Sequence, residues 1–480
     1  MMLKYFLGID VGTQGVRVLL VDQHGETIAG AQKDFVLDDL FRQEQSTNTW
    51  WETCEELVDE LISSLSKDVD RSAIVAASVT STSGTVIPLD KNNEPLSKAI
   101  MYSDPRSITQ GERIKKCAQE YNPEGYTGFN ASSGLSKILW YVENNPDKVI
   151  HITRWVHAAD YIVGKLSSVY GITDYTNALK SGYDLQKLEW PSFIHVELGL
   201  DPNWFPSVVP SGTVVGKLDS GLAARWGIGE VALVVGLTDG CASQMASGAV
   251  KVGDWNTTIG TTMVIKGVTK SAVNDPLGRV YSHRHPQGQW MPGGASNTGA
   301  DWVTLDFAHL GLEKLNKAAQ GLIPTGKLAW PLKQQGERYP IMAPQARAIV
   351  PVNLNAQELY AANMEGVAFL ERFAYECIEE LSGEKVGAVY TAGGASKSDV
   401  WLMIRASVLN LPIFRCKETS GALGAAIIAA SQTFYSTLTQ ACENMTSADK
   451  KVMPEAKLVQ AYELQYKNFK KKLIDLGYLE

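Results

Sequence analysis

The stretch FLGIDVGTQG, residues 6–15, joins an apolar run to a tight glycine turn. A second apolar run follows at residues 16–22 and a third strand is expected from about Thr27, so this part of the chain predicts a β-meander. Because the glycine turn links two strands and does not open a helix, it is neither a dinucleotide-binding fingerprint nor a P-loop. Exposed N–H groups and a threonine hydroxyl in such a turn can still hold a phosphate, with Asp10 beside them for Mg²⁺. An ordinary glycine hairpin is the alternative interpretation.

The same outline occurs again near the middle of the chain. After the meander, residues 50–64 have apolar residues at helical spacing and residues 74–80 form a buried type of strand. An apolar strand at residues 231–235 and a strand–Gly–Thr–strand pattern at residues 257–266 then repeat the beginning. The repeat predicts two similarly built halves that face one cleft, with a boundary near residues 245–255.

Composition excludes several classes of protein. The chain has 480 residues, of which 45% are hydrophobic and 20% charged, as expected for a globular protein with two to four domains. Its net charge of −8 lacks the basic excess of a nucleic-acid-binding protein. Since no apolar run reaches the ~18 residues needed to span a bilayer, we expect no membrane segment. The N-terminus is interpreted as a first strand and not as a signal peptide, and the six scattered cysteines as reduced thiols, which predicts a cytoplasmic protein.

Three further polar turns follow predicted strands. In GLTDG, residues 236–240, Asp239 lies between two glycines at a strand end, a position typical of a cleft, although it could also cap the next helix. TIGTT, residues 258–262, is a second turn with small hydroxyl side chains. AGGASKS, residues 392–398, joins a strand to a helix whose N-terminus favours anions. Trp401 lies one turn into that helix, where core packing is the commoner role of a tryptophan.

Together these motifs resemble a known family. DVGTQGVR, GLTDG, TIGTT and AGGASKSDVW, in this order and spacing, resemble the sugar kinases of the FGGY family, which has the hexokinase–actin type of ATP-binding fold. The resemblance covers about residues 3–435. It implies an α/β protein with two ribonuclease H-like domains around a central cleft. We expect an N-terminal domain at residues 1–248 for sugar and phosphate, a C-terminal domain at 249–435 for the nucleotide, and a helical tail at 436–480.

Five further stretches resemble the D-ribulose kinases of the plant and cyanobacterial type. They are SVTSTSGTVIPLD (78–90), MYSDPR (101–106), DYTNALKSGYD (174–184), VYSHRHPQGQWMPGGASNTG (280–299) and PLKQQGERYPI (331–341). Xylulose kinases of the usual type carry a Gln-Met-His segment where this chain has residues 81–85, Ser-Thr-Ser-Gly-Thr. The resemblance therefore implies phosphorylation of D-ribulose, with D-xylulose or another ketose or polyol as the alternative. Ala395 stands where close relatives often have a third glycine, a change expected to tune nucleotide affinity.

The resemblance implies a role for each site residue, with ATP and Mg²⁺ as the cofactors. Asp239 is the expected general base, and Asp10 together with Asp239 is expected to hold Mg²⁺ through water. Arg17 either adds charge here or is a surface residue. The residues expected at the nucleotide phosphates are Gly12, Thr13, Gln14, Gly260, Thr261 and Thr262. Those expected at the adenosine are Gly393, Gly394, Ser398 and Trp401. Those expected at the sugar are Ser83, Asp104, Asp239 and Ser296.

Other interpretations are weaker. His283 and His285 alternate to one face of a strand, but no third ligand with clear spacing follows, so zinc is disfavoured. A catalytically silent, actin-like scaffold has no need for both Asp10 and Asp239. A sugar-responsive regulator needs a DNA-binding appendage, and the first strand begins at about residue 4. We therefore expect a small-molecule sugar as partner, no nucleic acid or membrane, and a monomer or homodimer.

Overall fold

The first strand, β1 (Tyr5–Gly12), lies inside a six-stranded sheet of the computed structural model, which describes residues 3–36, 38–123, 125–126 and 128–479. β1 pairs antiparallel with β2 (Gly15–Asp22), and β2 pairs antiparallel with β3 (Thr27–Asp34). On its other side β1 runs parallel to β5 (Ile74–Ser81). The predicted meander is therefore confirmed. The sheet is completed by β12 (Ala232–Val234), parallel to β5, and β11 (Val214–Lys217), antiparallel to β12.

A second sheet repeats this arrangement in the C-terminal half. Its central strand β13 (Asp254–Ile259) pairs antiparallel with β14 (Met263–Gly267) and parallel with β17 (Ala388–Ala392). The full order is β15-β16-β14-β13-β17-β18-β19, which adds β15 (Val280–Arg284), β16 (Trp290–Ser296), β18 (Ile413–Cys416) and β19 (Ala448–Val452). In both sheets three antiparallel strands adjoin two parallel ones and an antiparallel edge strand, and the second sheet has one further strand, β15, next to β16. The prediction of two similarly built halves is confirmed.

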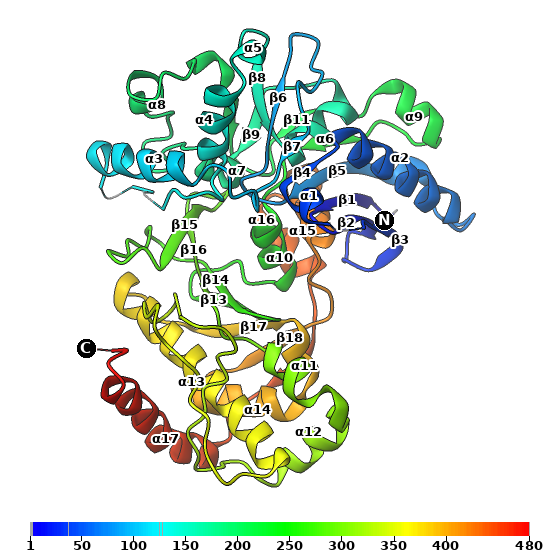
Figure 1. Cartoon of the computed structure of the whole chain (residues 1–480). Coiled ribbons are helices and arrows are strands. Elements are labelled where there is room, and N and C mark those ends of the chain that lie inside the picture. Colours follow the sequence, from blue (N-terminus) through cyan, green and yellow to red (C-terminus); the bar gives the residue numbers. More distant parts are fainter. Residues whose placement is uncertain (1–2, 37, 124, 127, 480) are drawn as a thin grey trace. The chain divides into compact units, whose positions relative to one another are not determined.

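The chain divides into two compact units that are not continuous in sequence (Figure 1). Unit 1 comprises Met1–Ala246, His283–Gly288 and Glu418–Thr446, and unit 2 comprises Ser247–Ser282, Gln289–Lys417 and Ser447–Glu480. The first crossing lies next to the expected boundary at residue 248. However, the chain returns to unit 1 for residues 418–446, and the expected tail at 436–480 is split between the two units. The three consecutive segments expected from the sequence therefore differ from these units.

Helix α15 (Gly421–Thr433) explains why residues 418–446 belong to unit 1. It packs on β1 and β5, and its first eleven residues are buried. The approach is so close that a Cβ on Gly8 of β1 would lie 1.8 Å from the carbonyl oxygen of Ala422. Only glycine fits there, and the Gly/Ala-rich sequence of α15 is what permits this packing. Among the described residues, no helix is long and apolar enough to cross a membrane.

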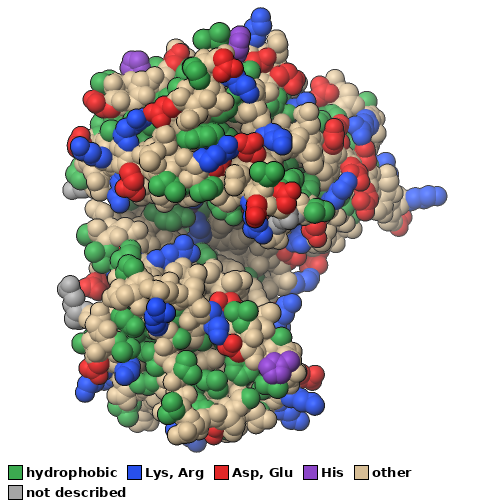
Figure 2. All heavy atoms as spheres, viewed as in Figure 1, with side chains coloured by type: hydrophobic (Ala, Val, Ile, Leu, Met, Phe, Trp, Pro, Cys, Tyr) green, Lys and Arg blue, Asp and Glu red, His purple; other side chains and the backbone are tan. Residues whose placement is uncertain are grey.

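The core of unit 2 contains three long helices. They are α13 (Ala356–Ser382), α14 (Asp399–Leu409) and α17 (Ala456–Asp475). The lysine- and tyrosine-rich α17 was expected to be a solvated cover, and it does bury one stripe of side chains, among them Tyr462, Phe469 and Leu473. Figure 2 shows acidic and basic side chains interspersed over the visible face of each unit.

Candidate active site

Two carboxylates lie at the carboxyl ends of parallel strands β1 and β12, which flank β5 in the sheet of unit 1. Asp10 is near the end of β1, and Asp239 opens helix α10 (Asp239–Ser247) soon after β12. A parallel bridge between Ser81 and Thr238 continues the sheet up to the residue before Asp239. Ligands of open α/β sheets bind at this edge, because loops diverge there. The structure thus brings the two predicted acids together.

The charge of Asp239 acts on Asp10. Burial and, to a smaller extent, the negative charge of Asp239 raise the pKa of Asp10 to about 7, against the opposing effect of the positive charge of Arg17. Arg17 itself is exposed and donates to Gln32 Oε1 at 2.7 Å, so it acts on Asp10 only through its charge. An acid whose charged form is this unfavourable is suited to a cation.

The surroundings of Asp10 fit a divalent cation. Its Oδ1 is buried and has no hydrogen-bond partner among the described residues. Beside the other oxygen, a Cβ on Gly421 would lie 2.5 Å from Oδ2, so the first residue of α15 leaves room only as glycine. Within the part of the chain that the structure describes, no group of three or more His, Cys, Asp or Glu could hold a metal. One or two carboxylates with water ligands are the usual protein share of a Mg²⁺ site.

The turn after Asp10 is held by its backbone and leaves its side chains available. Gln45 donates to the carbonyl of Thr13 at 3.0 Å, and the Phe35 N–H donates to the carbonyl of Gln14 at 2.7 Å. A Cβ on Gly12 would meet only the carbonyl of Gly15, at 3.6 Å. The Thr13 side chain is half-buried and that of Gln14 is exposed. This turn is compatible with the phosphate role expected for Gly12, Thr13 and Gln14.

Asp239 is exposed at the start of its helix. Its Oδ1 accepts a hydrogen bond from the N–H of Gly240 at 2.7 Å, and Asp239 is the first helical residue. A carboxylate there also faces the positive end of the helix dipole. Asp239 is therefore placed to accept a proton from a ligand at the strand edge.

Ser83 lies in the turn that follows β5. Gly84 has φ +84°, and a Cβ there would lie 2.3 Å from the carbonyl of Ser132, so the turn requires glycine. The hydroxyls of Thr82 and Thr85 bond to each other at 2.9 Å, whereas the buried Oγ of Ser83 has no partner among the described residues. An unpaired hydroxyl at this strand edge can bind a polyol hydroxyl.

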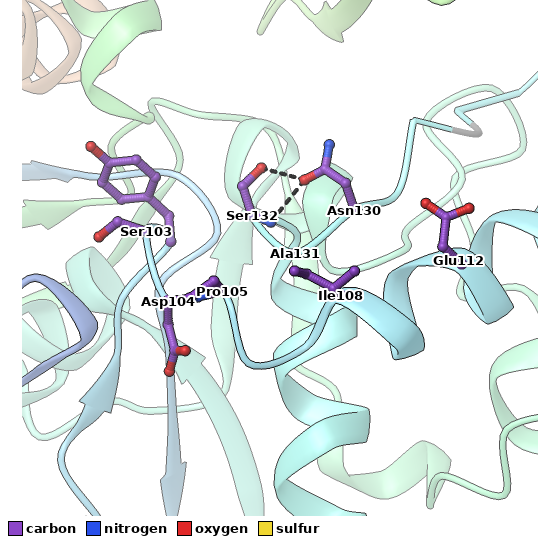
Figure 3. Close-up of a pocket in the computed structure, with 9 residues that line it drawn as sticks. Ser103, Asp104, Pro105, Ile108, Glu112, Asn130, Ala131 and Ser132 are labelled. Carbon is purple, nitrogen blue, oxygen red and sulfur yellow. Dashed lines mark hydrogen bonds between the residues drawn. The ribbon is translucent and has the colours of Figure 1, made fainter.

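Asp104 is placed differently. It is buried, and the Arg106 guanidinium contacts both of its oxygens, with Nε at 3.0 Å from Oδ1 and 2.9 Å from Oδ2. A hollow of about 440 Å³ adjoins it, lined by Tyr102, Ser103, Asp104, Pro105, Ile108, Glu112, Asn130, Ala131 and Ser132. In Figure 3 the Asp104 carboxylate points away from the hydrogen-bonded pair of Asn130 and Ser132. Its charge is thus engaged by Arg106.

The loop of Asp104 is also held by a buried lysine. Lys137 lies in α4 (Gly134–Asn144) and is fully buried, and its Nζ donates to the carbonyl of Ala131 and lies 3.5 Å from that of Asp104. Burial lowers the pKa of Lys137 to about 7. The lysine therefore ties together two segments that line the hollow.

Ser296 does not match the role expected for it. It lies on β16 in unit 2, whereas the other expected sugar residues lie in unit 1. Its hydroxyl donates to Glu337 Oε2 at 2.8 Å and accepts from the N–H of Thr298 at 2.9 Å. Since the side chain is fully buried and both hydrogen-bonding roles are used, Ser296 is a structural residue, which corrects the expectation.

The second hydroxyl turn lies between β13 and β14. The N–H of Gly260 donates to the carbonyl of Thr262 at 3.0 Å, and a Cβ on Gly260 would meet nothing within 4 Å. Thr261 is exposed and Thr262 half-buried. This open turn is compatible with the expected phosphate contacts.

The glycine loop after β17 lies against this turn. Gly393 has φ +86°, and a Cβ on it would lie 2.6 Å from the carbonyl of Ile259. The close approach of the ends of β13 and β17 therefore requires glycine at this position. Gly394 is exposed with open space around it. The hydroxyl of Ser398 caps α14 by accepting from the Trp401 N–H at 3.3 Å and donates to Asn316 at 2.7 Å. Ser398 thus fixes the loop.

Trp401 corrects a second expectation. Its side chain is 2% exposed, its indole N–H donates to the carbonyl of Met364 at 3.1 Å, and its ring lies 5.6 Å from that of Trp302. A ring packed in this way cannot cover an adenine. Trp401 is a core residue because its face of α14 packs against α13.

Two buried groups of residues were missed. Asp174 and Thr176 support the loop of Asp239, and Glu337 supports that of Ser296. Both lie in stretches quoted for the resemblance, which is the signal that could have indicated them. His283 on β15 and His285, which directly follows that strand, were disfavoured as zinc ligands, and both are buried.

Comparisons with known proteins agree with this architecture. The FGGY family of carbohydrate kinases matches with its N-terminal domain over residues 5–246 and its C-terminal domain over residues 248–433. A gluconokinase from Bacillus licheniformis is 27% identical over 89% of this chain and 87% of its own, and a xylulose kinase from Bacillus subtilis (strain 168) is 26% identical over 98% and 96%.

Solved structures share the fold. The structure of a xyloylose kinase from Brucella ovis covers 99% of this chain and 100% of its own with a TM-score of 0.89 at 23% identity. That of a gluconate kinase from Lactobacillus acidophilus covers 99% and 98% with a TM-score of 0.85 at 22% identity. The α/β fold of the hexokinase–actin type is confirmed. With both family domains matched in order along nearly the whole chain, the protein belongs to the FGGY family of carbohydrate kinases.

Proposed function

We propose that the protein uses ATP to phosphorylate the terminal hydroxyl of a pentulose, converting D-ribulose to D-ribulose 5-phosphate. The observation that carries the choice of sugar is the turn at residues 81–85, where the small hydroxyl residues Ser-Thr-Ser-Gly-Thr stand in place of the Gln-Met-His of the usual xylulose kinases. The unpaired Oγ of Ser83 supports it, because a polyol is recognised through hydrogen bonds to its hydroxyls. The enzyme is proposed to act in the cytoplasm as a monomer or homodimer.

Asp239 is proposed as the general base. Phosphoryl transfer needs the sugar hydroxyl in line with the γ-phosphorus and an acceptor for its proton. Asp239 is exposed at the strand edge beside Asp10 and can accept that proton as the oxygen attacks. General-base catalysis of this kind contributes about 10²–10⁴-fold to the rate.

Asp10 is proposed to hold Mg²⁺ through water, with Asp239 as the second carboxylate. When bound, the metal neutralises charge on the nucleotide phosphates. Asp10 is suited to this role because its Oδ1 lacks a partner among the described residues and because its charge is unfavourable without a cation.

The nucleotide contacts are proposed for turns in each unit. Backbone N–H groups and hydroxyls of Gly12, Thr13 and Gln14 and of Gly260, Thr261 and Thr262 are proposed to bind phosphate oxygens. Gly393 and Gly394 are proposed to admit the adenosine close to backbone. Ser398 is proposed to stabilise this loop, because its hydroxyl caps helix α14.

D-Xylulose is the second candidate acceptor, because several relatives of similar length are xylulose kinases. A gluconokinase matches at comparable identity, so D-gluconate belongs in the same test. Asp104 is kept as a weaker proposal for the sugar, since Arg106 already engages its carboxylate.

A coupled ADP-release assay tests the proposal. ATP, Mg²⁺ and each of D-ribulose, D-xylulose, D-gluconate and glycerol are supplied separately, with the Asp239→Ala variant as the blank for every sugar. We expect the highest kcat/KM for D-ribulose. A higher value for any other acceptor overturns the choice of sugar, and ADP release by the variant equal to that of the wild type overturns the assignment of the base.

A further inference from the structure

A buried carboxylate lies behind the loop that carries Asp239. Strand β9 (Ile172–Asp174) ends at Asp174, which caps the helix α7 (Tyr175–Lys180). Its Oδ1 accepts from the N–H of Thr176 at 2.6 Å and from the Thr176 hydroxyl at 2.5 Å, and its Oδ2 accepts from Asn177 Nδ2 at 2.5 Å. All three residues are at most 1% exposed. Asp174 is thus surrounded by donors and holds Thr176 in one orientation.

The oriented Thr176 hydroxyl forms a hydrogen bond with the loop of Asp239. A hydroxyl has one proton, so donation to Asp174 turns a lone pair of Thr176 Oγ1 away from the carboxylate. That oxygen accepts from the N–H of Thr238 at 2.8 Å. On the opposite side of the loop, the Thr80 hydroxyl donates to the carbonyl of Leu237 at 2.7 Å. Both backbone groups of the Leu237–Thr238 peptide, directly before Asp239, are therefore held by buried threonines.

We propose that Thr176 and Thr80 are positioning residues for Asp239, with Asp174 setting the direction of the Thr176 hydroxyl. The inference rests on the proposed function, in which Asp239 accepts the proton of the sugar hydroxyl. Asp239 directly follows the Leu237–Thr238 peptide and opens α10, so a displacement of that peptide also displaces its carboxylate. A catalytic group displaced by a fraction of an ångström loses rate steeply, because the reaction requires a near-attack geometry.

Three variants separate positioning from a general loss of stability. Thr176→Val keeps the shape and removes the hydroxyl, and Thr176→Ser restores it. Thr173→Val is the matched control, because Thr173 is equally buried on β9 but its hydroxyl contacts His157 Nδ1 at 2.9 Å, not the Asp239 loop. We expect Thr176→Val to lower kcat about tenfold with the KM for ATP within twofold of wild type, Thr176→Ser to recover most of kcat, and Thr173→Val to keep the wild-type kcat.

The outcomes separate this inference from the proposed function. Wild-type kcat in Thr176→Val, while Asp239→Ala is inactive, overturns the positioning role and leaves the base in place. An active Asp239→Ala overturns the proposed base itself. Equal losses of kcat in Thr176→Val and Thr173→Val show a structural effect only and also overturn the inference. If Thr176→Val does not fold, Thr80→Val replaces it. We expect the same fall in kcat for Thr80→Val, and a wild-type kcat in that variant, while Asp239→Ala is inactive, overturns the positioning role.

Discussion

In both units the central strand enters a Gly-Thr turn before its antiparallel neighbour, β1 at Gly12–Thr13 and β13 at Gly260–Thr261. Two residues before the glycine, unit 1 has Asp10 and unit 2 has Thr258. Oδ1 of Asp10 is buried without a partner among the described residues, whereas the Thr258 hydroxyl donates to Asn256 Oδ1 at 3.1 Å. The strand order common to both sheets therefore determines where the Gly-Thr turn lies. The residue two positions before the glycine, Asp10 or Thr258, determines whether a charged side chain lies beside that turn.

The loops that follow the parallel neighbours of these central strands, β5 in unit 1 and β17 in unit 2, also differ in their side chains. Residues 81–85, which begin at the last residue of β5, carry four hydroxyl side chains, whereas β17 is followed by Gly393 and Gly394. Hydroxyls suit recognition of a polyol, and bare backbone suits the close approach of a flat or phosphorylated group. The same strand order is thus compatible with two different binding roles, proposed here as sugar binding in unit 1 and nucleotide binding in unit 2.

The largest expected effect comes from removing the exposed acid of unit 1, Asp239, which lies at the start of helix α10. Asp239→Ala should lower kcat by about 10²–10⁴-fold while the melting temperature and ATP affinity stay near wild type. Thr258→Ala, at the position in unit 2 that corresponds to Asp10, is the control from the other unit and should lower kcat less than about tenfold, since it loses one neutral hydrogen bond. Steady-state ADP release and thermal unfolding of both variants check this. Retention of more than about a tenth of wild-type kcat in Asp239→Ala would contradict it.

Trp401→Ala should act on the stability of unit 2 and not on the nucleotide. Removing a fully buried tryptophan costs about 3–5 kcal/mol of unfolding free energy. The KM for ATP, measured well below the melting temperature, should stay within about twofold of wild type, because the ring lies in the core. Denaturant unfolding gives the first value and initial rates the second, with Trp401→Phe as the milder variant. A raised KM for ATP at unchanged stability would restore the adenine-binding role.

The pKa of Asp10 predicts a pH-dependent gain in stability when the acid is neutralised. The folded pKa of about 7 exceeds the ordinary 3.8, so the proton bound by the folded state contributes stability that is full below about pH 3.8 and is lost as the pH rises through 7. Without Mg²⁺, Asp10→Asn should therefore melt about 3 °C above wild type at pH 8 and lose this advantage by pH 4.

Mg²⁺ should raise the melting temperature of the wild type at pH 8 and leave that of Asp10→Asn unchanged. The exposed Asp68→Asn serves as a control for the loss of a negative charge. A variant less stable than wild type at pH 8 without metal would refute the sign of this effect.

The smallest expected effect separates the two serines assigned to the sugar from sequence. Ser83→Ala should raise the KM for the preferred sugar about three- to tenfold, because one hydrogen bond to a hydroxyl is lost. Ser296→Ala should leave that KM unchanged and lower the melting temperature, because its partner Glu337 then loses a donor. Initial rates and thermal scans of both variants check this, and equal rises in KM would speak against it.

The spacing of apolar residues was enough to predict the helices and strands that bury one regular face in a core. The helix predicted from residue 50 begins at Thr47 in α2 (Thr47–Ser64), because the Ser46 hydroxyl accepts from the Thr49 N–H at 3.3 Å and caps it. Asp239 was singled out because an acid between two glycines at a strand end is poorly placed for a core, and Asp10 because it lies beside a Gly-Thr turn that can hold a phosphate.

Long-range packing could not be predicted in this way. The composition of residues 421–430 indicates a buried helix but not the sheet that it covers, which lies more than 400 residues earlier at β1. In the same way, the position of Trp401 one turn after a glycine loop does not tell which side of α14 packs on α13. Ser296 was misassigned because its partner Glu337 is 41 residues away.

The return of residues 418–446 to unit 1 has a consequence for biosynthesis. The N-terminal sheet is translated first, but the helix that covers Gly8 and its neighbours leaves the ribosome only when most of the chain has been made. Until then an apolar face of β1 and β5 is open to water, a state that attracts chaperones and favours aggregation. The protein cannot mature one unit at a time, and a chain that stops before residue 418 would lack part of both units.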